Sequence, residues 1–522
     1  MVAGEGIVDE ALAGLVHQFA DPMACFRELV QNAIDADSNE IDIRFGHEDG
    51  RLVIDVDDFG DGMDRRIIDT KLTRLFSSTK DDDRTKIGRF GIGFVSVFAL
   101  EPDVIRIDTS RAGEHWRVVF RPDRTFTRVA RSEPVDGTKI RIYKAASRED
   151  AQAFARRATE AIAYWCRHVS VEIRVDGRVI NEAFDVPARC KVAVEVGEAR
   201  IVAGFATDGA SRVGYYNRGL TLLEEPGREF AGVHLKVWSP ALEHTMTRDN
   251  VLRDAGYERV MGHARKLIRG ALREQLVESL ATEVPAHHRP GDAHEHLYAA
   301  LTELLARQEA PARAWQRPFV RTIEGALVDL ATLARAKQKE RLWAAAAASP
   351  TTRLLSARGD VVVATAGESS LLALLRAALA APVPVDEVWF AAPRVPAIGR
   401  PPGWAPLVTA LRAIAGVELA GVELADLGYP GSPVARRVAV AQPGPGGLAR
   451  LAEATTLTPG GWLVLHDGHP LVREALALAS REPEFAAIKL LKLFFLERPD
   501  LSTSRALALT TAAVEARWRR TT

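Results

Sequence analysis

Apolar and polar positions in the first part of the chain follow two different periods. Residues 8–37 show helical spacing and predict two helices, whereas residues 40–45 and 51–58 alternate and predict a pair of strands. Residues 64–76 again fit a helix. Three more alternating segments predict strands, at 103–110, 115–122 and 137–144. Together these elements predict an α+β domain over residues 1–147.

The middle of the chain carries a second group of strand patterns. A helical pattern over 148–166 precedes them, and residues 255–283 are helical again. The strand patterns lie at 169–180, 191–196, 199–206 and 233–239. We therefore expect an α/β middle domain over residues 148–290.

The last part of the chain is richer in helix. Helical spacing dominates residues 293–346, where the Ala-rich stretch LWAAAAASP is interpreted as helix. From residue 353, short apolar strands alternate with Leu- and Ala-rich helices, which predicts a small α/β layer. Helices over 470–495 and 502–519 end the chain. We expect residues 291–522 to form a helical and α/β C-terminal region.

Composition is typical of a soluble globular protein, with 47% hydrophobic and 26% charged residues among 522. Lys and Arg number 68 against 69 Asp and Glu, so no global basic excess favours nucleic acid or an anionic membrane as partner. Cys25, Cys166 and Cys190 form neither a disulfide framework nor a zinc pattern, which favours a reducing, cytoplasmic location. We find no signal peptide, and no apolar run long enough to span a bilayer.

The stretch FRELVQNAIDA, residues 26–36, places polar groups on one side of a helix. Glu28, Asn32 and Asp35 follow one another at i, i+4 and i+7, so they share a face. The opposite side is apolar and predicts a buried face, through Met23, Phe26, Val30 and Ala33. Taken alone, the triplet is typical of an ordinary solvated helix face.

Two glycine-containing stretches follow this helix. In DDFGDGMD, residues 57–64, Gly60 and Gly62 allow a tight turn beside Asp58, where a buried carboxylate could accept a hydrogen bond from an amine. In IGRFGIGF, residues 87–94, three glycines precede an apolar helix, and bare amides at a helix start favour phosphate. These are Gly88, Gly91 and Gly93. Separately, the stretches also fit a plain Asp–Gly turn and a hinge.

A third short motif, Asp136-Gly137-Thr138, begins a predicted strand. By itself it fits a hairpin turn. The order and spacing of all four motifs together resemble the ATPase domain shared by gyrase, heat-shock chaperones, sensor histidine kinases and mismatch-repair proteins. Within that superfamily, FRELVQNAIDA, SSTK and IGRFGIGFVSVF resemble the heat-shock protein 90 family, including its bacterial form. The resemblance implies a Bergerat-type α/β-sandwich ATPase domain.

The resemblance gives the polar helix face a role. Asn32 would supply a neutral oxygen to Mg²⁺, and Glu28 would orient or deprotonate the water that attacks the γ-phosphate of ATP. Asp35 would support the site. Asp58 would accept a hydrogen bond from the adenine amine, with help from Thr138. The other expected nucleotide contacts are Gly62, Met63, Lys80, Gly88, Gly91, Gly93 and Phe94.

Two later stretches resemble the same family. LEHTMTRDNVLRD, residues 242–254, is similar to a middle-domain loop whose arginine reaches the γ-phosphate, which implies a catalytic role for Arg248. WLVLHDGHPLVREALALA, with His469 and Pro470, is similar to the piece that precedes the dimer helices. We therefore expect an ATP-dependent chaperone clamp that acts on client proteins and forms a homodimer through residues 470–520.

The chain also departs from that family. The segment between Lys80 and Gly88 is short and acidic, and Lys71 falls near the place of an asparagine. The alternatives are a nucleic-acid or defence-associated remodelling ATPase, a histidine kinase, and a pseudo-enzyme that binds ATP without hydrolysing it. Near-neutral charge argues against the first alternative. The short segment before Glu28 leaves little room for the phospho-accepting helix of a kinase, and an intact Glu28 argues against a pseudo-enzyme.

Overall fold

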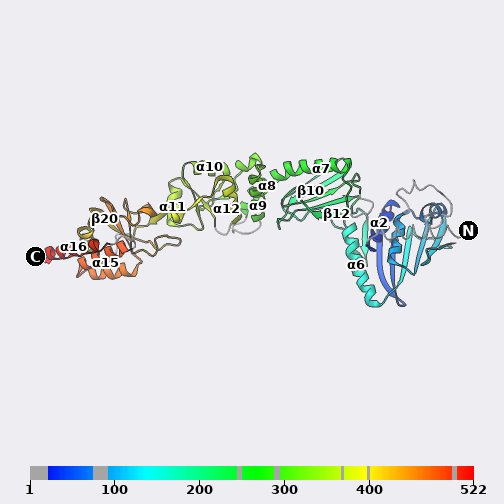
Figure 1. The fold of residues 1–522 in the computed structure, drawn as a ribbon, viewed down its shortest axis with the longest axis horizontal. Helices are drawn as coiled ribbons and strands as arrows, with labels where there is room; N and C mark the ends of the chain where they lie inside the picture. Colours follow the sequence, from blue (N-terminus) through cyan, green and yellow to red (C-terminus); the bar gives the residue numbers. More distant parts are fainter. Residues whose placement is uncertain are drawn as a thin grey trace. The chain divides into compact units, whose positions relative to one another are not determined.

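The computed structural model describes residues 21–73, 92–243, 250–286, 294–365, 369–396, 400–496 and 502–521 (Figure 1). Residues 1–272 and 273–522 form two compact units, which we describe separately. The predicted α+β class is confirmed, because a large mixed sheet lies in the first unit and smaller sheets with helices lie in the second. The expected three-way division into 1–147, 148–290 and 291–522 stays a prediction.

The first unit contains an eight-stranded sheet in the order β5-β4-β3-β6-β2-β1-β7-β8. Its strands are β1 (Glu40–Glu48), β2 (Arg51–Asp58), β3 (Val104–Arg111), β4 (Glu114–Phe120), β5 (Phe126–Ala130), β6 (Thr138–Ala145), β7 (Glu172–Val175) and β8 (Arg178–Val179). Side chains alternate between the two faces of a strand. In β1, Ile41 and Ile43 are therefore fully buried on one face, whereas Asp42 and Arg44 lie on the other.

Helices cover the apolar face of this sheet. Helix α2 buries Phe26, Leu29 and Val30 in the same core as Ile41 and Ile54 of the sheet. Figure 1 shows α2 and α6 beside the sheet. The helical segments are α2 (Ala24–Asp35), α3 (Arg65–Ile67), η1 (Ile68–Leu72), α5 (Ile92–Val95), η3 (Ser96–Leu100) and α6 (Arg148–Cys166).

The sheet continues past residue 147, where we expected the first domain to end. After α6 crosses the apolar face, β7 pairs in parallel with β1, with Ile41 opposite Ile173. Ile173 is fully buried and belongs to the same core as Ile41. The eight-stranded sheet therefore includes strands from before and after α6, because the edge of β1 is completed by a strand that lies beyond this helix.

A five-stranded sheet in the order β12-β11-β13-β10-β9 completes the first unit, with α7 packed against it. Its elements are β9 (Lys191–Val196), β10 (Ala199–Phe205), β11 (Arg212–Asn217), β12 (Leu220–Pro226), β13 (Val233–Trp238), α7 (Ala255–Leu267) and η4 (Ile268–Leu272). The hairpin of β11 and β12 was not among the predicted strands, because the Gly and Tyr residues of RVGYYN give a weak alternating pattern.

The second unit begins with helices and continues with three small sheets, in the orders β17-β16-β18, β19-β22 and β20-β23-β21, besides the β14-β15 pair. Its strands are β14 (Val320–Arg321), β15 (Leu327–Val328), β16 (Leu342–Ala345), β17 (Val361–Ala364), β18 (Val383–Pro384), β19 (Trp389–Ala392), β20 (Leu419–Ala425), β21 (Ala439–Gln442), β22 (Gly447–Arg450) and β23 (Gly461–His466). The helices are α8 (Arg273–Ala286), α9 (Glu295–Ala306), α10 (Leu330–Gln338), α11 (Pro350–Ala357), α12 (Ser369–Leu379), α13 (Trp404–Ile414), α14 (Pro470–Ala479), α15 (Pro483–Leu496) and α16 (Thr503–Thr521), with short turns at η5 (Ala312–Trp315), η6 (Val385–Glu387) and η7 (Leu451–Glu453).

The interpretation of LWAAAAASP as helix is wrong. Its first residues form β16, a buried strand parallel to β17, and α11 starts only at Pro350. Glu340 has a left-handed backbone, φ 56°, and ends the preceding helix, so the chain enters the sheet instead. Tertiary burial here overrides the helix propensity of alanine.

The C-terminal helices share a core with α13 and the sheet of β20, β23 and β21. In α15, Leu491 and Phe495 are buried in that core, whereas Phe485 is 61% exposed. Most of the apolar stripe of α15 is therefore intramolecular. Leu496 at the end of α15 is also 61% exposed, and on α16 Leu507, Val514 and Trp518 are 64–67% exposed.

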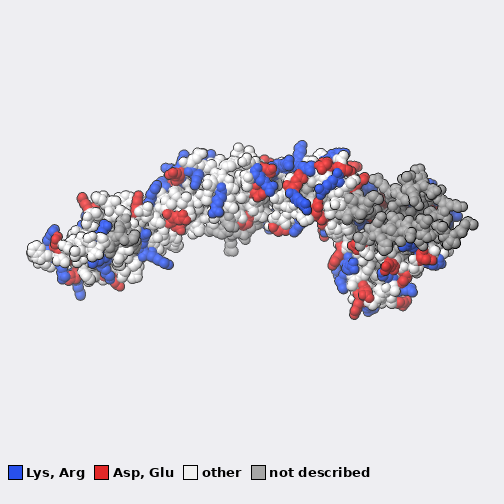
Figure 2. Space-filling model, viewed as in Figure 1, with Lys and Arg blue, Asp and Glu red and all other residues white. Residues whose placement is uncertain are grey.

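Charges of both signs are interspersed over the face seen in Figure 2, in keeping with the near-neutral composition. Across the described segments, none of the helices is long and apolar enough to cross a membrane. All three cysteines are buried and free.

Candidate nucleotide site

The end of β2 presents a buried carboxylate. Asp58, the last residue of β2, pairs in register with Thr138 of β6 and is 9% exposed. Its Oδ1 accepts hydrogen bonds from the main-chain N–H groups of Gly60, at 3.1 Å, and Thr138, at 3.2 Å. Burial raises the pKa of Asp58 to about 6, although the two N–H donors oppose that shift. At pH 7 the Asp58 carboxyl is therefore mostly ionised, and it can accept hydrogen bonds.

The turn after Asp58 needs its glycines. A Cβ on Gly60 would lie 2.4 Å from the carbonyl oxygen of Ala36, and a Cβ on Gly62 would lie 2.1 Å from that of Ser110. Gly62 also has a left-handed backbone, φ 67°. Glycine is therefore required at both positions of the D-x-G-x-G motif, because the main chain of Ala36 approaches Gly60 and that of Ser110 approaches Gly62.

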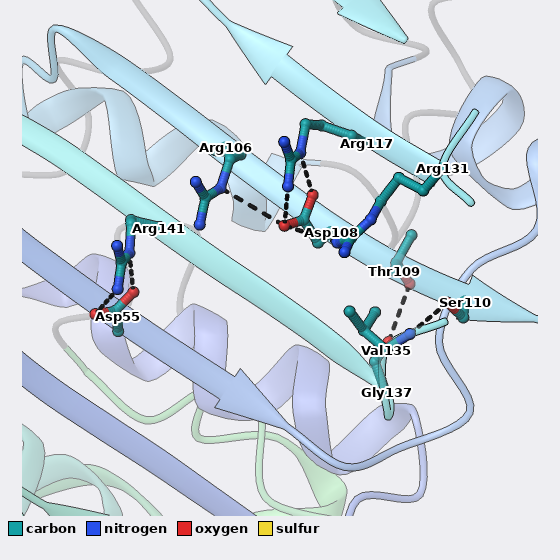
Figure 3. Close-up of polar contacts among 10 residues, drawn as sticks. All are labelled: Asp55, Arg106, Asp108, Thr109, Ser110, Arg117, Arg131, Val135, Gly137 and Arg141. Carbon is teal, nitrogen blue, oxygen red and sulfur yellow. Dashed lines mark hydrogen bonds and ion pairs between the residues drawn. The ribbon is translucent and has the colours of Figure 1, made fainter. Parts of the chain in front are cut away.

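Thr109 ties this turn to the start of β6, and the sequence interpretation missed it. Its Oγ1 accepts the N–H of Met63 at 2.8 Å and lies 3.1 Å from Oγ1 of Thr138. The contact of Thr109 with the carbonyl of Gly137, at 3.3 Å, is drawn in Figure 3. Thr109 sits at the end of β3 in an otherwise apolar position, which is the signal that could have identified it.

The polar face of α2 lies beside the short helix α5. Glu28 is 6% exposed, and a Cβ on Gly93 would come within 2.7 Å of its Oε2. Gly93 thus leaves room for the Glu28 carboxylate. The ring of Phe94 turns the other way and packs against Phe120 in the core, with 5.5 Å between ring centroids. A nucleotide contact by Phe94 would therefore have to come from its main chain.

The end of α2 is joined to the Asp58 turn. The carbonyl of Ala36 accepts the N–H of Asp61 at 2.8 Å, and Oγ of Ser38 accepts the N–H of Phe59 at 2.9 Å. Asn32 is exposed on the last turns of the same helix. The structure therefore places the end of α2 beside the turn that follows Asp58, and the nucleotide-binding roles of these residues stay predictions.

Asp35 takes part in a contact that the sequence did not indicate. Its Oδ1 accepts hydrogen bonds from Nε2 of Gln31, at 3.1 Å, and from Nη1 of Arg218, at 3.0 Å. Four of the predicted site residues lie outside the described residues, and their roles stay predictions. They are Lys80, Gly88, Gly91 and Arg248.

The donors present fit Mg²⁺ bound together with a nucleotide. The described residues hold no cluster of three or more His, Cys, Asp or Glu that could bind a metal ion alone. Mg²⁺ keeps several waters and shares its shell with phosphate oxygens, so one amide oxygen is enough from the protein. Asn32 is an exposed amide one helical turn from Glu28 and meets that requirement.

Comparisons with known proteins match part of the chain to a family of ATPases. Residues 23–150 match the family model of histidine kinase-, DNA gyrase B-, and HSP90-like ATPases. A stretch of 165 residues is 28% identical to the chaperone protein HtpG of Burkholderia lata, and the match covers 28% of this chain and 26% of that protein. Residues 23–150 are therefore an ATPase domain of the histidine kinase, gyrase B and HSP90 type.

Proposed function

We propose that the chain binds and hydrolyses ATP, and that hydrolysis drives a chaperone-like conformational clamp. One observation carries the proposal: a buried carboxylate, Asp58, is held by two main-chain donors at a turn that tolerates only glycine at two positions. This turn lies inside the segment that matches the ATPase family.

We assign recognition of the adenine base to the second carboxylate oxygen of Asp58, Oδ2. Both of these main-chain hydrogen bonds use Oδ1, and within the described residues we find no partner for Oδ2. An ionised carboxylate accepts hydrogen bonds only. Oδ2 would accept one from the exocyclic amine of adenine, whereas guanine would present a carbonyl oxygen at that place. The linked hydroxyls of Thr109 and Thr138 would hold a water beside the base.

We assign hydrolysis to the polar residues of α2, Glu28 and Asn32, rather than to the Asp58 turn. Glu28 would orient the attacking water and accept its proton as the bond to the γ-phosphorus forms and the bond to the β-γ bridging oxygen breaks. Asn32 would hold Mg²⁺, which neutralises phosphate charge when it is bound. We assign Arg248 the task of stabilising the charge that develops on the γ-phosphate.

The clamp is the part of the proposal that reaches beyond the ATPase domain. It is supported by the partial match to HtpG, a protein named as a chaperone, and by the C-terminal resemblance around His469 and Pro470. We propose client proteins as partners and a homodimer formed by the C-terminal helices. The exposed apolar residues of α16 are one part of those helices that is available for a second copy.

Calorimetry with Mg²⁺·ATP and Mg²⁺·GTP tests the proposal. We expect ATP to bind and GTP to bind about 10- to 100-fold more weakly, because a buried carboxylate would face a carbonyl oxygen without a proton between them. Removal of Mg²⁺ with a chelator should weaken ATP binding. Absence of ATP binding, or equal affinity for GTP, would contradict the proposed site.

A further inference from the structure

The turn between β11 and β12 is fixed against the ATPase part of the first unit. Gly219 has a left-handed backbone, φ 88°, and a Cβ there would lie 2.3 Å from the carbonyl oxygen of His168, just after α6. Oγ1 of Thr221 donates to the carbonyl of Tyr164 at 2.7 Å. Leu220 is 2% exposed and belongs to the core of the eight-stranded sheet. The hairpin tip is therefore packed against the end of α6 and the core of the eight-stranded sheet. Since β11 and β12 belong to the five-stranded sheet, these contacts connect the two sheets.

Arg218 stands at the tip of this hairpin and reaches the end of α2. Its backbone is left-handed, φ 50°, and its Nη1 donates to Oδ1 of Asp35 at 3.0 Å across 183 positions of sequence. A cation is favoured at the C-terminal end of a helix. Helix α2 has no basic residue in its own last turn, so Arg218 supplies that charge from another element.

The last turn of α2 also touches the candidate nucleotide site. The N–H of Ala36 donates to the carbonyl of Asn32 at 3.0 Å, and the carbonyl of Ala36 accepts the N–H of Asp61 at 2.8 Å. One helical turn thus carries the expected Mg²⁺ ligand, supports the turn after Asp58, and ends at the carboxylate that Arg218 holds. A change in this turn on ligand binding would change the Arg218–Asp35 contact.

We propose that Arg218 is a positioning residue that couples nucleotide occupancy to the five-stranded sheet. The inference rests on the proposed function, since it requires that ATP binds beside α2. Coupling is reciprocal: if the Arg218–Asp35 pair favours the ligand-bound form of the helix end, then bound nucleotide strengthens the pair. The side chains are 59% and 28% exposed, so the effect should be modest, about two- to fivefold in affinity.

The test combines ATP affinity with amide hydrogen exchange of residues 212–226, measured with and without Mg²⁺·ATP. We expect ATP to slow exchange in this hairpin of the wild-type protein. Arg218→Ala should lose that response and bind ATP about two- to fivefold more weakly, with a smaller difference at about 0.5 M salt, where exposed charges are screened. Arg218→Lys should restore part of both effects, because it keeps the charge.

Arg212→Ala is the matched control. Arg212 lies on β11 of the same hairpin, is 62% exposed, and forms a 3.1 Å ion pair with Asp208, away from α2. It should behave as the wild type does. Wild-type ATP binding without a hairpin response, or an Arg218→Ala protein that matches the wild type in either measurement, would overturn the coupling alone. Absence of wild-type ATP binding would overturn the proposed function, and the coupling with it.

Discussion

At the scale of single residues, Asp58 combines a cost in stability with a proposed function. An ordinary aspartate titrates near 3.8, and burial raises the pKa of Asp58 to about 6. Between these values the folded protein holds a proton that the unfolded chain has lost, so stability falls as pH rises toward 6, and the full cost is present above it. The adjacent Asp57 carboxylate lies on the other face of the sheet and, unlike that of Asp58, has a cationic partner: it forms an ion pair with Arg44 at 2.6 Å.

We therefore predict that Asp58→Asn stabilises the ligand-free protein above pH 6, by at most about 3 kcal/mol, while it abolishes ATP binding. Asparagine keeps an oxygen for the two main-chain donors and carries no charge to bury. Thermal unfolding at pH 7.5 and pH 5 measures the first effect, and calorimetry the second. Asp57→Asn is the control and should not stabilise. An Asp58→Asn protein that is less stable at pH 7.5 would contradict the burial argument.

Sequence motifs pointed to some of the candidate site residues and missed others, for physical reasons. Asp58, Gly62 and Glu28 stand in local motifs whose spacing already limits the backbone. Thr109 and Arg218 act through contacts across the fold. The local signal of Thr109 is only a hydroxyl in an apolar position of β3, and Arg218 lies in a hairpin that the strand patterns did not predict. Phe94 was expected to contact the nucleotide, and its ring packs in the core beside Phe120, which leaves its main chain for such a contact.

At the scale of elements, the polar face of the eight-stranded sheet carries a series of ion pairs. Figure 3 shows Asp55 with Arg141 and, one strand further, Asp108 among three arginines. Arg117 binds Asp108 with two contacts of 2.6 and 2.8 Å, Arg131 lies 2.8 Å away and Arg106 3.6 Å. Asp108 thus neutralises cations from β3, β4 and the segment after β5.

Asp108→Asn should destabilise the first unit by about 1–3 kcal/mol, because three guanidinium groups lose their shared carboxylate. Burial opposes the charged form, but the arginines prevail and hold the pKa of Asp108 below its ordinary value. Its contribution is therefore present above the ordinary aspartate pKa and is lost as pH falls through the lower folded value. Denaturant unfolding at pH 7 and pH 3 should show a larger difference between the proteins at pH 7 than at pH 3. Asp49→Asn, in the exposed β1–β2 turn, is the control, and an equal loss there would refute the prediction.

Local patterns predicted most strands of the eight-stranded sheet, but they did not predict that β7 would pair with the edge of β1. Alternation identified β1, β2, β3, β4 and β6, because each has one buried and one polar face. The parallel pairing of β7 with β1 depends on α6 crossing the sheet, which no local pattern encodes. The alanines of β16 were misassigned because short apolar runs fit a helix as well as a buried strand.

At the scale of the whole molecule, the proposed dimer depends on α16. Leu507, Val514 and Trp518 are spaced at i, i+7 and i+11, so they lie on one side of the helix. The opposite side, with Leu509 and Ala513, is buried against α13 and α15. An apolar helix face left exposed by its own core is typical of an association surface.

We predict that the double variant Leu507→Glu/Val514→Glu is a monomer while the unchanged chain is a dimer. Charges placed in an apolar contact must be buried without partners, which is costly. Light scattering at several concentrations gives the mass of each protein. Val129→Glu, at a 58% exposed valine of β5, is the matched control and should stay dimeric. If the wild-type protein is a monomer, the proposed clamp is wrong, whereas the ATPase assignment of residues 23–150 is unaffected.

Glu28 is proposed to act on the water that attacks the γ-phosphate, and the rates of phosphate release from Mg²⁺·ATP by the wild type and by Glu28→Gln measure that role. Glutamine preserves the shape beside Gly93 but cannot accept the proton of the attacking water. Glu28→Gln should bind ATP as the wild type does and release phosphate about 10²- to 10⁴-fold more slowly, whereas Asp37→Asn, just beyond α2, should hydrolyse normally. A Glu28→Gln protein that releases phosphate at the wild-type rate would contradict the account.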